Sequence, residues 1–332
     1  MKAIVCTQYG SPDVMQIQEV SQPVPKPNEV LIKVYATTVT AGDCELRRFD
    51  MPALFWLPLR LYIGITKPRK GVFGQELAGE VEAVGNLVKG FKKGDPVFAP
   101  TTIHFGAYAH YVSLPEGHLT KFNPDAMTFA SAATIPTGGI NGLHFVTKAN
   151  IKPGESVLIN GAGGSIGTYA LQFAKAHGAQ VTCVDSTIKL DMLHTLGADE
   201  VIDYTKHDFT RNGKAYAVII DIVGKSSFSR SVKSLKPNGR YVLGNPTFTG
   251  MLRALGTSMI SNKKVIFQFA DYRPENLVFI KDQIESGRVK PVIDKVYLFD
   301  QIPEAHRYVD AGLKCGNVII MVNQDVQKPS SV

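Results

Sequence analysis

The residues best suited to chemistry form one glycine-rich segment, 161–167 (GAGGSIG), between an apolar run and a helical pattern. Glycine has no Cβ atom, so the backbone N–H groups of such a turn can approach a pyrophosphate at the positive N-terminus of a helix. A strict GxGxxG pattern would need glycine at 166, and the spacing here is one residue longer. In its strand–loop–helix–strand context the segment predicts a dinucleotide site. The candidate contacts are Gly161, Gly163, Gly164, Ser165, Ile166 and Gly167.

The next two strands bear on which dinucleotide is bound. Asp185 ends the second apolar strand, where an acid accepts hydrogen bonds from the adenosine ribose and favours NAD. Ser186 and Lys189 follow it, and Tyr204 ends the third strand; these groups suit the 2′-phosphate of NADP(H). Neither residue need bind a cofactor: Lys189 could instead be a solvent-facing lysine in a first helical turn, and Tyr204 a hydrophobic residue at a strand end. The residues alone leave the choice open.

These side chains need a scaffold of alternating strands and helices, and that pattern follows Pro124. Short apolar runs predict strands over 157–160, 181–184, 201–202, 218–221 and 241–243. Apolar residues at helical spacing predict helices over 165–177, 189–196 and 228–235. Strands that alternate with short helices indicate an α/β fold with a parallel, doubly wound sheet.

The first part of the chain is β-rich. Short β-prone runs bounded by Gly, Pro, Asp or Asn predict strands over 3–6, 16–20, 29–37, 79–84, 96–99 and 107–113. The last part contains a β run over 265–269, helices over 275–286 and 303–311, and a strand over 318–322. A final strand after Gly316-Asn317 suggests that the chain returns to its first domain. We therefore expect two domains, 1–124 plus 271–332 and 125–270.

Five segments in order resemble the medium-chain dehydrogenase/reductase superfamily. They are 72–81 (VFGQELAGEV), 91–98 (FKKGDPVF), 106–109 (GAYA), 161–167 and 196–204 (LGADEVIDY), and the resemblance extends over essentially the whole chain. It implies a GroES-like β-rich domain joined to a Rossmann doubly wound parallel sheet. It also favours NADP(H) over NAD(H). We assign Gly244 and Asn317 to the cofactor site as well.

Within that superfamily, zinc alcohol dehydrogenases have metal ligands at positions that match Thr40, Gln75 and Thr137 here. Zinc prefers thiolate and imidazole ligands, which hydroxyl and amide groups do not replace. The chain is therefore similar to the zinc-free branch, which includes NADPH:quinone oxidoreductases and NAD(P)-dependent enone or alkenal reductases. Segment 40–47 (TAGDCELR) keeps the acid of the quinone reductases' Asn-Pro-Val-Asp/Glu motif but lacks its Asn and the following Tyr. Glu76 is expected to be a structural carboxylate.

The resemblance implies that hydride passes from the reduced cofactor to an electron-poor carbon of a quinone or an α,β-unsaturated carbonyl. The protein supplies positioning and hydrogen-bond donors for the developing oxyanion. The catalytic candidates are Thr40, Asp43, Arg47, Gln75 and Thr137. Alternatively, Thr40 caps a turn, Asp43 pairs with Arg47 along a helix, and Thr137 only bonds the backbone. Two other functions stay open: a zinc-free alcohol or aldehyde oxidoreductase, and a non-catalytic NADPH-binding scaffold or sensor.

The composition argues against several other classes of protein. The 332 residues include 36 Lys+Arg and 29 Asp+Glu, which gives a net charge of +7, and 44% are hydrophobic. A disordered chain has fewer apolar residues, and the dispersed basic residues give no reason to expect a nucleic-acid partner. The most apolar stretch, 54–65, is interrupted by Pro58 and Arg60, whereas a membrane-spanning helix needs about 20 residues. We expect a metal-free, cytoplasmic protein without a membrane partner.

The apolar run 265–269 (VIFQF) predicts how the chain assembles. It follows two lysines at the expected edge of the cofactor sheet, where an exposed strand is an aggregation hazard. Pairing with the same strand of a second copy would satisfy its backbone groups in an isologous contact. The resemblance implies the same arrangement, so we expect a homodimer. A second apolar segment, 54–62, is interpreted either as a pocket wall or as a core or dimer contact.

Overall fold

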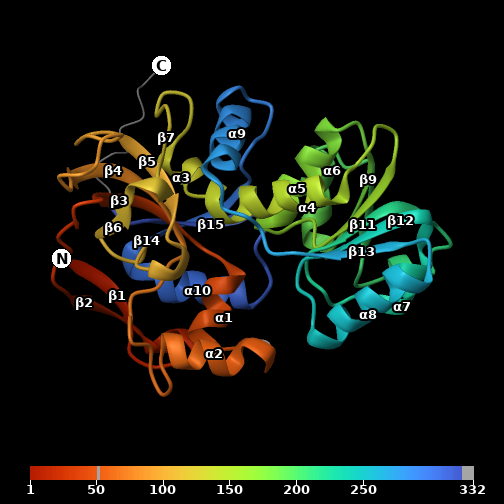
Figure 1. Cartoon of the computed structure of the whole chain (residues 1–332), viewed down its shortest axis with the longest axis horizontal. Helices are drawn as coiled ribbons and strands as arrows, with labels where there is room; N and C mark the ends of the chain where they lie inside the picture. The colour runs from red at the N-terminus through yellow and green to blue at the C-terminus, as the bar shows by residue number, and fades with distance from the viewer. Residues whose placement is uncertain (51–52, 324–332) are drawn as a thin grey trace. The chain divides into compact units, whose positions relative to one another are not determined.

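The computed structural model describes residues 1–50 and 53–323, which form two units. One unit consists of Met1–Thr137 together with Tyr272–Val332, and the other of Gly138–Asp271. In Figure 1 the blue C-terminal elements lie among the red and yellow elements of the first unit. The chain therefore leaves the first unit once and returns to it.

A β-sheet built from both ends of the chain organises the first unit. Its strands are β3 (Glu29–Val39), β4 (Glu76–Val84), β5 (Pro96–Pro100), β6 (Tyr111–Pro115), β7 (Thr120–Lys121), β14 (Ile293–Leu298) and β15 (Asn317–Met321). Within the described ranges they run in the order β14-β15-β3-β4-β5-β7, and β6 pairs with β3. Strand β15 is antiparallel to β3, with Val318 opposite Val39. This pairing confirms the predicted return of the chain.

Strand β3 forms the centre of this unit because its sequence, EVLIKVYATTV, is rich in β-branched and apolar residues. Such side chains pack well on a pleated surface, and all but one of its residues are buried. Each fully buried Val or Ile side chain contributes about 1.5–3 kcal/mol relative to an exposed one. The strand ends at Val39, directly before the first candidate catalytic residue, Thr40.

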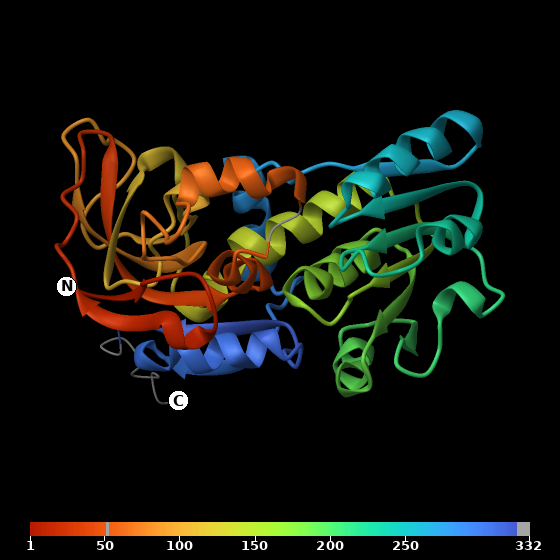
Figure 2. The same ribbon diagram turned by 90° about the horizontal axis from the view of Figure 1, so that it is seen from below.

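Helices cover this sheet and position its polar side chains. They are α1 (Ala41–Arg48), α2 (Ala53–Ile63), α3 (Phe129–Ala132), α9 (Pro274–Glu285) and α10 (Ile302–Asp310). Helix α10 buries Ile302, Ala305 and Val309 against the core. It also contacts the turn between β1 (Lys2–Cys6) and β2 (Met15–Glu19), and Figure 2 shows this blue helix beside the red hairpin.

A parallel sheet forms the second unit. Its strands are β8 (Ser156–Asn160), β9 (Gln180–Asp185), β10 (Glu200–Asp203), β11 (Tyr216–Asp221), β12 (Leu235–Leu243) and β13 (Lys264–Phe267). Across the part of the chain that is described, the order is β10-β9-β8-β11-β12-β13, with every neighbouring pair parallel. Residues 157–159 of β8 are fully buried, as a sheet covered on both faces requires.

Figure 1 shows helices on both faces of this sheet, which confirms the predicted doubly wound arrangement. They are α4 (Ile140–Ala149), α5 (Ser165–Ala176) and α6 (Leu190–Thr195) on one face, and α7 (Phe228–Lys233) and α8 (Phe248–Ile260) on the other. The strand order changes direction at β8, and ligands of open α/β sheets bind where such a switch occurs, at the carboxyl ends of the strands. The glycine-rich segment follows the carboxyl end of β8.

Two strands begin four or more residues away from the sequence-based expectation. The strand predicted over 107–113 begins only at Tyr111, because the preceding residues form a single isolated bridge, Ala3–Ala109. Strand β12 begins at Leu235, where the sequence predicts the end of a helix. Leu235 pairs with Tyr216, and the register then shifts around Asn238, which has a φ of 59°. An irregularity in the pairing therefore lies between the predicted helix over 228–235 and the predicted strand over 241–243.

The sequence did not predict helices α2, α4 and α8 or strand β14. Helix α2 contains Pro58 and α8 contains Gly250 and Gly256, residues that lower helix propensity. Strand β14 has no fully buried residue, so it lacks the apolar signature of the other strands. Tertiary contacts override these weak local preferences.

Segment 125–137, which the sequence places in the dinucleotide domain, clusters by contacts with the first unit. Phe129 of α3 packs edge-on against Tyr35 of β3, with ring centroids 4.8 Å apart, and against Phe122 at 5.2 Å. The chain enters the second unit inside a π-helix, Ile135–Gly139. The division into independent domains, 1–124 plus 271–332 and 125–270, stays a prediction.

Candidate functional site

The glycine-rich loop leaves β8 and leads into α5, where the sequence placed it. Gly161 has a φ of +84°, in the left-handed region, and a Cβ atom there would overlap Val223 Cγ2. A Cβ atom at Gly167 would lie 2.5 Å from Ala162 Cα, and backbone cannot yield there. The turn and the close packing of helix on strand therefore require glycine at both positions.

Helix α5 presents its N-terminus at this loop. Its N-cap, Gly164, has an extended backbone and makes no side-chain cap hydrogen bond. A Cβ atom at 164 would be 3.8 Å from its nearest neighbour, so the space beside the N-cap is open. The first turn of a helix carries partial positive charge, and Ser165 and Ile166 begin this one. The loop can therefore hold a pyrophosphate.

Asp185, at the end of β9, binds the loop from the next strand. Its Oδ2 accepts the Gly163 N–H at 2.7 Å, and its Oδ1 accepts the Ser186 N–H at 2.8 Å. Lys189 Nζ lies 3.1 Å from the same Oδ1, and the two side chains are only 7% and 11% exposed. Lys189 is therefore not a solvent-facing lysine, which was the alternative interpretation of this position. It is buried and paired with the one acid that would favour NAD.

Tyr204 and Ser186 complete the rim of this region. Tyr204 follows β10, donates its backbone N–H to the Asp185 carbonyl at 3.1 Å, and is 60% exposed. Ser186 is half-buried and precedes the short 3-10 turn Thr187–Lys189. The three residues assigned to the 2′-phosphate therefore gather around Asp185.

A buried carboxylate, Asp221, fastens the carboxyl ends of three neighbouring strands. It accepts Asn160 Nδ2 at 2.9 Å from β8 and the Tyr241 hydroxyl at 2.8 Å from β12, and also the Ser226 hydroxyl. Gly244 donates its N–H to the Asp221 carbonyl at 2.8 Å. A Cβ atom at Gly244 would lie 2.9 Å from Ile222 Cα. The sequence analysis missed this network, whose only signal was an acid at the end of an apolar strand.

In the first unit, Thr40 and Asp43 form a capping box at the start of α1. The Thr40 N–H and hydroxyl donate to Asp43 Oδ2 at 2.9 and 2.6 Å, and Asp43 N–H donates to the Thr40 hydroxyl oxygen at 3.1 Å. Gln75 Nε2 donates to the same hydroxyl oxygen at 3.3 Å. Three candidate residues thus lie together, and Thr40 also has the capping role of the structural alternative.

The Asp43 carboxyl group is fully buried. Burial raises its pKa, and hydrogen bonds from Thr40 and Gln75 oppose that rise. Within residues 1–50 and 53–323, its Oδ1 atom has no hydrogen-bond partner. A buried oxygen without a partner is rare in folded proteins and suits a ligand or a water molecule.

Glu76, beside Gln75, holds the fourth candidate residue. Its carboxylate accepts the Thr38 hydroxyl and, at 2.6 Å, the backbone N–H of Thr137. Burial raises the pKa of Glu76 to about 7, although both hydrogen bonds act to lower it. Glu76 therefore connects β4 and β3 to the π-helix, and its expected structural role agrees with these contacts.

Arg47 pairs with a different acid from the one that the structural alternative gave it. It does not pair with Asp43; its Nη2 lies 2.5 Å from Asp310 Oδ2 in α10, and its Nε donates to the Gly10 carbonyl at 3.0 Å. The side chain is completely buried. Asn317 likewise donates its side-chain amide to the Val292 carbonyl at 3.0 Å in the first unit. A catalytic role for Arg47 and a cofactor contact for Asn317 stay predictions.

A buried polar chain that the sequence analysis missed joins α1 to α10 and β3. Cys44 Sγ lies 3.3 Å from His306 Nδ1, His306 Nε2 lies 3.1 Å from the Tyr108 hydroxyl, and that hydroxyl donates to the Thr38 carbonyl at 3.3 Å. Burial, with the nearby Arg47 cation, lowers the pKa of His306 to about 3. The neutral imidazole therefore links α1, through the Tyr108 hydroxyl, to β3.

The positions that the resemblance matches to zinc ligands carry none of the thiolates and imidazoles that zinc prefers. Thr40 and Gln75 offer a hydroxyl and an amide, and Thr137 contributes its backbone N–H to Glu76. Among the described residues, no three His, Cys, Asp or Glu side chains gather to hold an ion. The same residues include no helix long and apolar enough to cross a membrane.

Comparisons with known proteins add to this geometry. Residues 26–124 match a family described as an alcohol dehydrogenase GroES-like domain, and residues 196–320 match one described as a zinc-binding dehydrogenase. The 2-methylene-furan-3-one reductase of Solanum lycopersicum is 33% identical, over 96% of this chain and 79% of that protein. The chloroplastic NADPH-dependent alkenal/one oxidoreductase of Arabidopsis thaliana is 31% identical, with the same coverage. The solved quinone oxidoreductase of Coxiella burnetii superposes with a TM-score of 0.88 at 24% identity, covering 97% of this chain and 99% of that one.

Proposed function

We propose that this chain, which belongs to the medium-chain dehydrogenase/reductase superfamily and is an oxidoreductase, uses NADPH without zinc to reduce an α,β-unsaturated carbonyl or a quinone. The reductases of tomato and Arabidopsis support the unsaturated carbonyl as the first substrate class to test. The bound cofactor would supply the hydride, and the protein would supply orientation, hydrogen bonds and exclusion of water.

The Asp185–Lys189 ion pair is the observation that carries the NADPH part of the proposal. Both Asp185 oxygens already accept backbone N–H groups, and Lys189 balances the charge. An acid engaged in this way offers less to ribose hydroxyls than a free one and repels a 2′-phosphate less. Lys189, with Ser186 and the exposed Tyr204, would then bind that phosphate.

On the substrate side, Gln75 is the proposed hydrogen-bond donor for the carbonyl oxygen, because its Nε2 carries a second N–H besides the one that it donates to Thr40. Thr40, whose single hydroxyl proton goes to Asp43 Oδ2, is proposed to hold the Gln75 amide in place. The capping box with Asp43 holds the hydroxyl, and Glu76 fixes Thr137. Arg47, which pairs with Asp310 of α10, is proposed to act indirectly, by positioning helix α1 and its capping box.

Assembly and location complete the proposal. Strand β13 lies at the edge of the six-stranded sheet. Its first residue, Lys264, is exposed, and Phe269, two residues beyond its end, is 77% exposed. An open apolar edge supports a homodimer formed by pairing of β13 with its copy. Within the described residues Cys6, Cys44 and Cys183 are buried free thiols, which suit a reducing cytoplasm.

A cofactor-consumption screen tests the proposed reaction. The purified chain is mixed with NADPH or NADH and with a panel of enals, enones, quinones and saturated aldehydes, and loss of the reduced cofactor is followed. We expect turnover with NADPH and an enal or enone, and unchanged rates after chelator treatment. Turnover restricted to saturated aldehydes would replace the proposed reaction with C=O reduction. Stoichiometric zinc required for activity would overturn the zinc-free assignment.

A further inference from the structure

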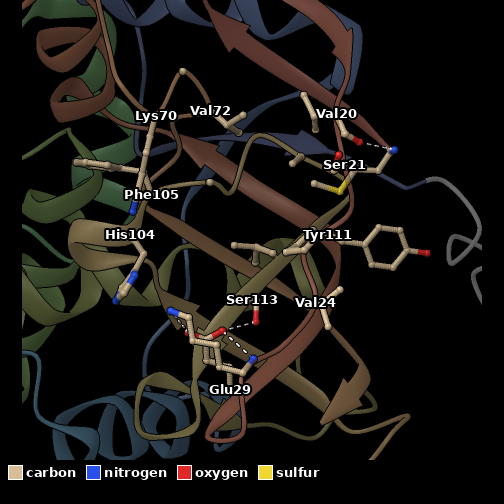
Figure 3. Close-up of a pocket in the computed structure, with 17 residues that line it drawn as sticks. Val20, Ser21, Val24, Glu29, Lys70, Val72, His104, Phe105, Tyr111 and Ser113 are labelled. Carbon is tan, nitrogen blue, oxygen red and sulfur yellow. Dashed lines mark hydrogen bonds and ion pairs between the residues drawn. The ribbon is translucent and has the colours of Figure 1, made fainter. Parts of the chain in front are cut away.

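Two adjoining cavities in the first unit form a groove that is separate from the Thr40 cluster. The larger has a volume of about 570 Å³ and is drawn in Figure 3, and the smaller has about 310 Å³. Lys70 and Phe105 line both, so we call the pair the Lys70 groove. Cavities of this size hold small organic ligands.

The walls of the Lys70 groove are apolar side chains that the fold leaves in contact with water. Val24, Tyr62 and Ile103 line it and are 85%, 51% and 61% exposed. In Figure 3, Val72 and Phe105 add further apolar surface. Scattered exposed apolar residues are ordinary, but several gathered around one groove indicate a binding surface.

The unbalanced charge in the groove is positive. Lys70 and Arg69 line it, together with Lys26 and the Met1 N-terminus, which pair with Glu29 and Glu19. In Figure 3 the His104 imidazole lies on the same side as Lys70. Glu29 is the single acid lining the two cavities among the described residues. Its carboxylate is already engaged by Lys26 Nζ at 3.3 Å and the Ser113 hydroxyl at 3.0 Å. Lys70, which lines both cavities, and Arg69, which lines the smaller one, are therefore the exposed cations that can meet a ligand.

The segment that carries Ile103, His104 and Phe105 into the groove has an unusual backbone. Thr102 and Phe105 have φ values of 50° and 52°, in the left-handed region that side chains rarely occupy. The conformation is especially unfavourable for a β-branched residue such as Thr102. Strained residues of this kind cluster at ligand-binding segments. The strain presents Ile103 and Phe105 to the groove.

We propose that the Lys70 groove binds an amphipathic anion, a linear alkyl chain that ends in a carboxylate. The carboxylate pairs with Lys70 and accepts a hydrogen bond from His104, and the chain lies against Phe105, Val72 and Val24. Charge-assisted hydrogen bonds fix the head. Each buried methylene of the tail strengthens binding by up to about fourfold. The substrate cluster takes no part in this site.

Isothermal titration calorimetry of the full chain with octanoate, decanoate and dodecanoate, below their micelle concentrations, tests the proposal. We expect saturable binding that tightens with chain length, and weaker binding of 1-decanol than of decanoate. Lys70→Gln should weaken decanoate binding about tenfold and leave decanol unchanged. Lys67→Gln is the matched control, because Lys67 is an exposed lysine of the same loop that lines neither cavity. Ile103→Ser should weaken acid and alcohol alike.

Three results would overturn the site. They are no saturable binding, equal binding of decanoate and decanol, or equal effects of Lys70→Gln and Lys67→Gln. A separate measurement uses vesicles with anionic headgroups. Binding to vesicles without binding of monomeric acids would assign this surface to a membrane and contradict the proposal. The measurement needs neither cofactor nor turnover, so its outcome is independent of the proposed reaction.

Discussion

Replacing Lys189 by alanine probes the cofactor preference at its proposed source. A charge-assisted hydrogen bond contributes about 1.5–3 kcal/mol, or about 10-fold to 150-fold in affinity. Lys189 must first loosen its contact with Asp185, 3.1 Å away, which offsets part of that gain. We therefore expect Lys189→Ala to raise the Kd for NADPH by about 10-fold, at the lower end of the range.

The same substitution should affect NADH differently. It leaves the Asp185 carboxylate without its cation but still bound to the N–H groups of Gly163 and Ser186. The loop keeps its anchor, and the acid becomes more available to the ribose hydroxyls. The Kd for NADH should therefore stay unchanged or fall.

Fluorescence titration of each variant with NADPH and NADH measures both constants. Lys206→Ala is the control, because Lys206 is an exposed lysine near the same strand ends that pairs with Asp203. It should change neither constant appreciably. An equal loss of affinity for both cofactors in Lys189→Ala would refute the reasoning, since Lys189 would then act only by holding Asp185 and the loop.

Four further outcomes follow from the geometry. Gly167→Ala would bring its Cβ within 2.5 Å of Ala162 Cα and should abolish NADPH binding in the same titration, whereas Gly256→Ala, with no neighbour within 4 Å, should leave binding intact. Glu76 has a folded-state pKa of about 7 against 4.5, so the folded state binds the extra proton and stability should fall by about 3 kcal/mol as pH rises from 4.5 to 7. Urea unfolding across that range should have a flatter profile in Glu76→Gln, and an unchanged profile would contradict the assignment. His306→Ala removes the partner of two buried groups and should lower the free energy of unfolding by about 2–4 kcal/mol, with partial rescue in His306→Gln. Phe267→Lys should give monomers or precipitate in light scattering, and a stable monomer of the parent chain at micromolar concentration would remove the dimer.

The sequence by itself determined the features that depend on neighbours along the chain. The glycine loop, its preceding strand and its following helix were all located, because a left-handed turn and a close helix approach leave a direct mark on residue type. The alternation of apolar strands with helices likewise predicted the parallel sheet, because each element's periodicity is a property of neighbouring residues. Helices α4 and α8 were not predicted, because their local sequence patterns are weak and contacts with the sheet stabilise them.

Only the tertiary structure decided how the charged groups are partnered. The sequence offered a pair between Arg47 and Asp43, four residues away, as the alternative to a catalytic role, but the partner of Arg47 is Asp310, in a helix that the chain reaches much later. Burial of Asp43 and Glu76 depends on strands and helices that close over them, and no local pattern records that closure. An electrostatic role is set by distance and by exclusion of water, which belong to the folded chain rather than to residue type. Asp185 and Lys189, beside the glycine-rich loop, could be named from the sequence, but their pairing could not.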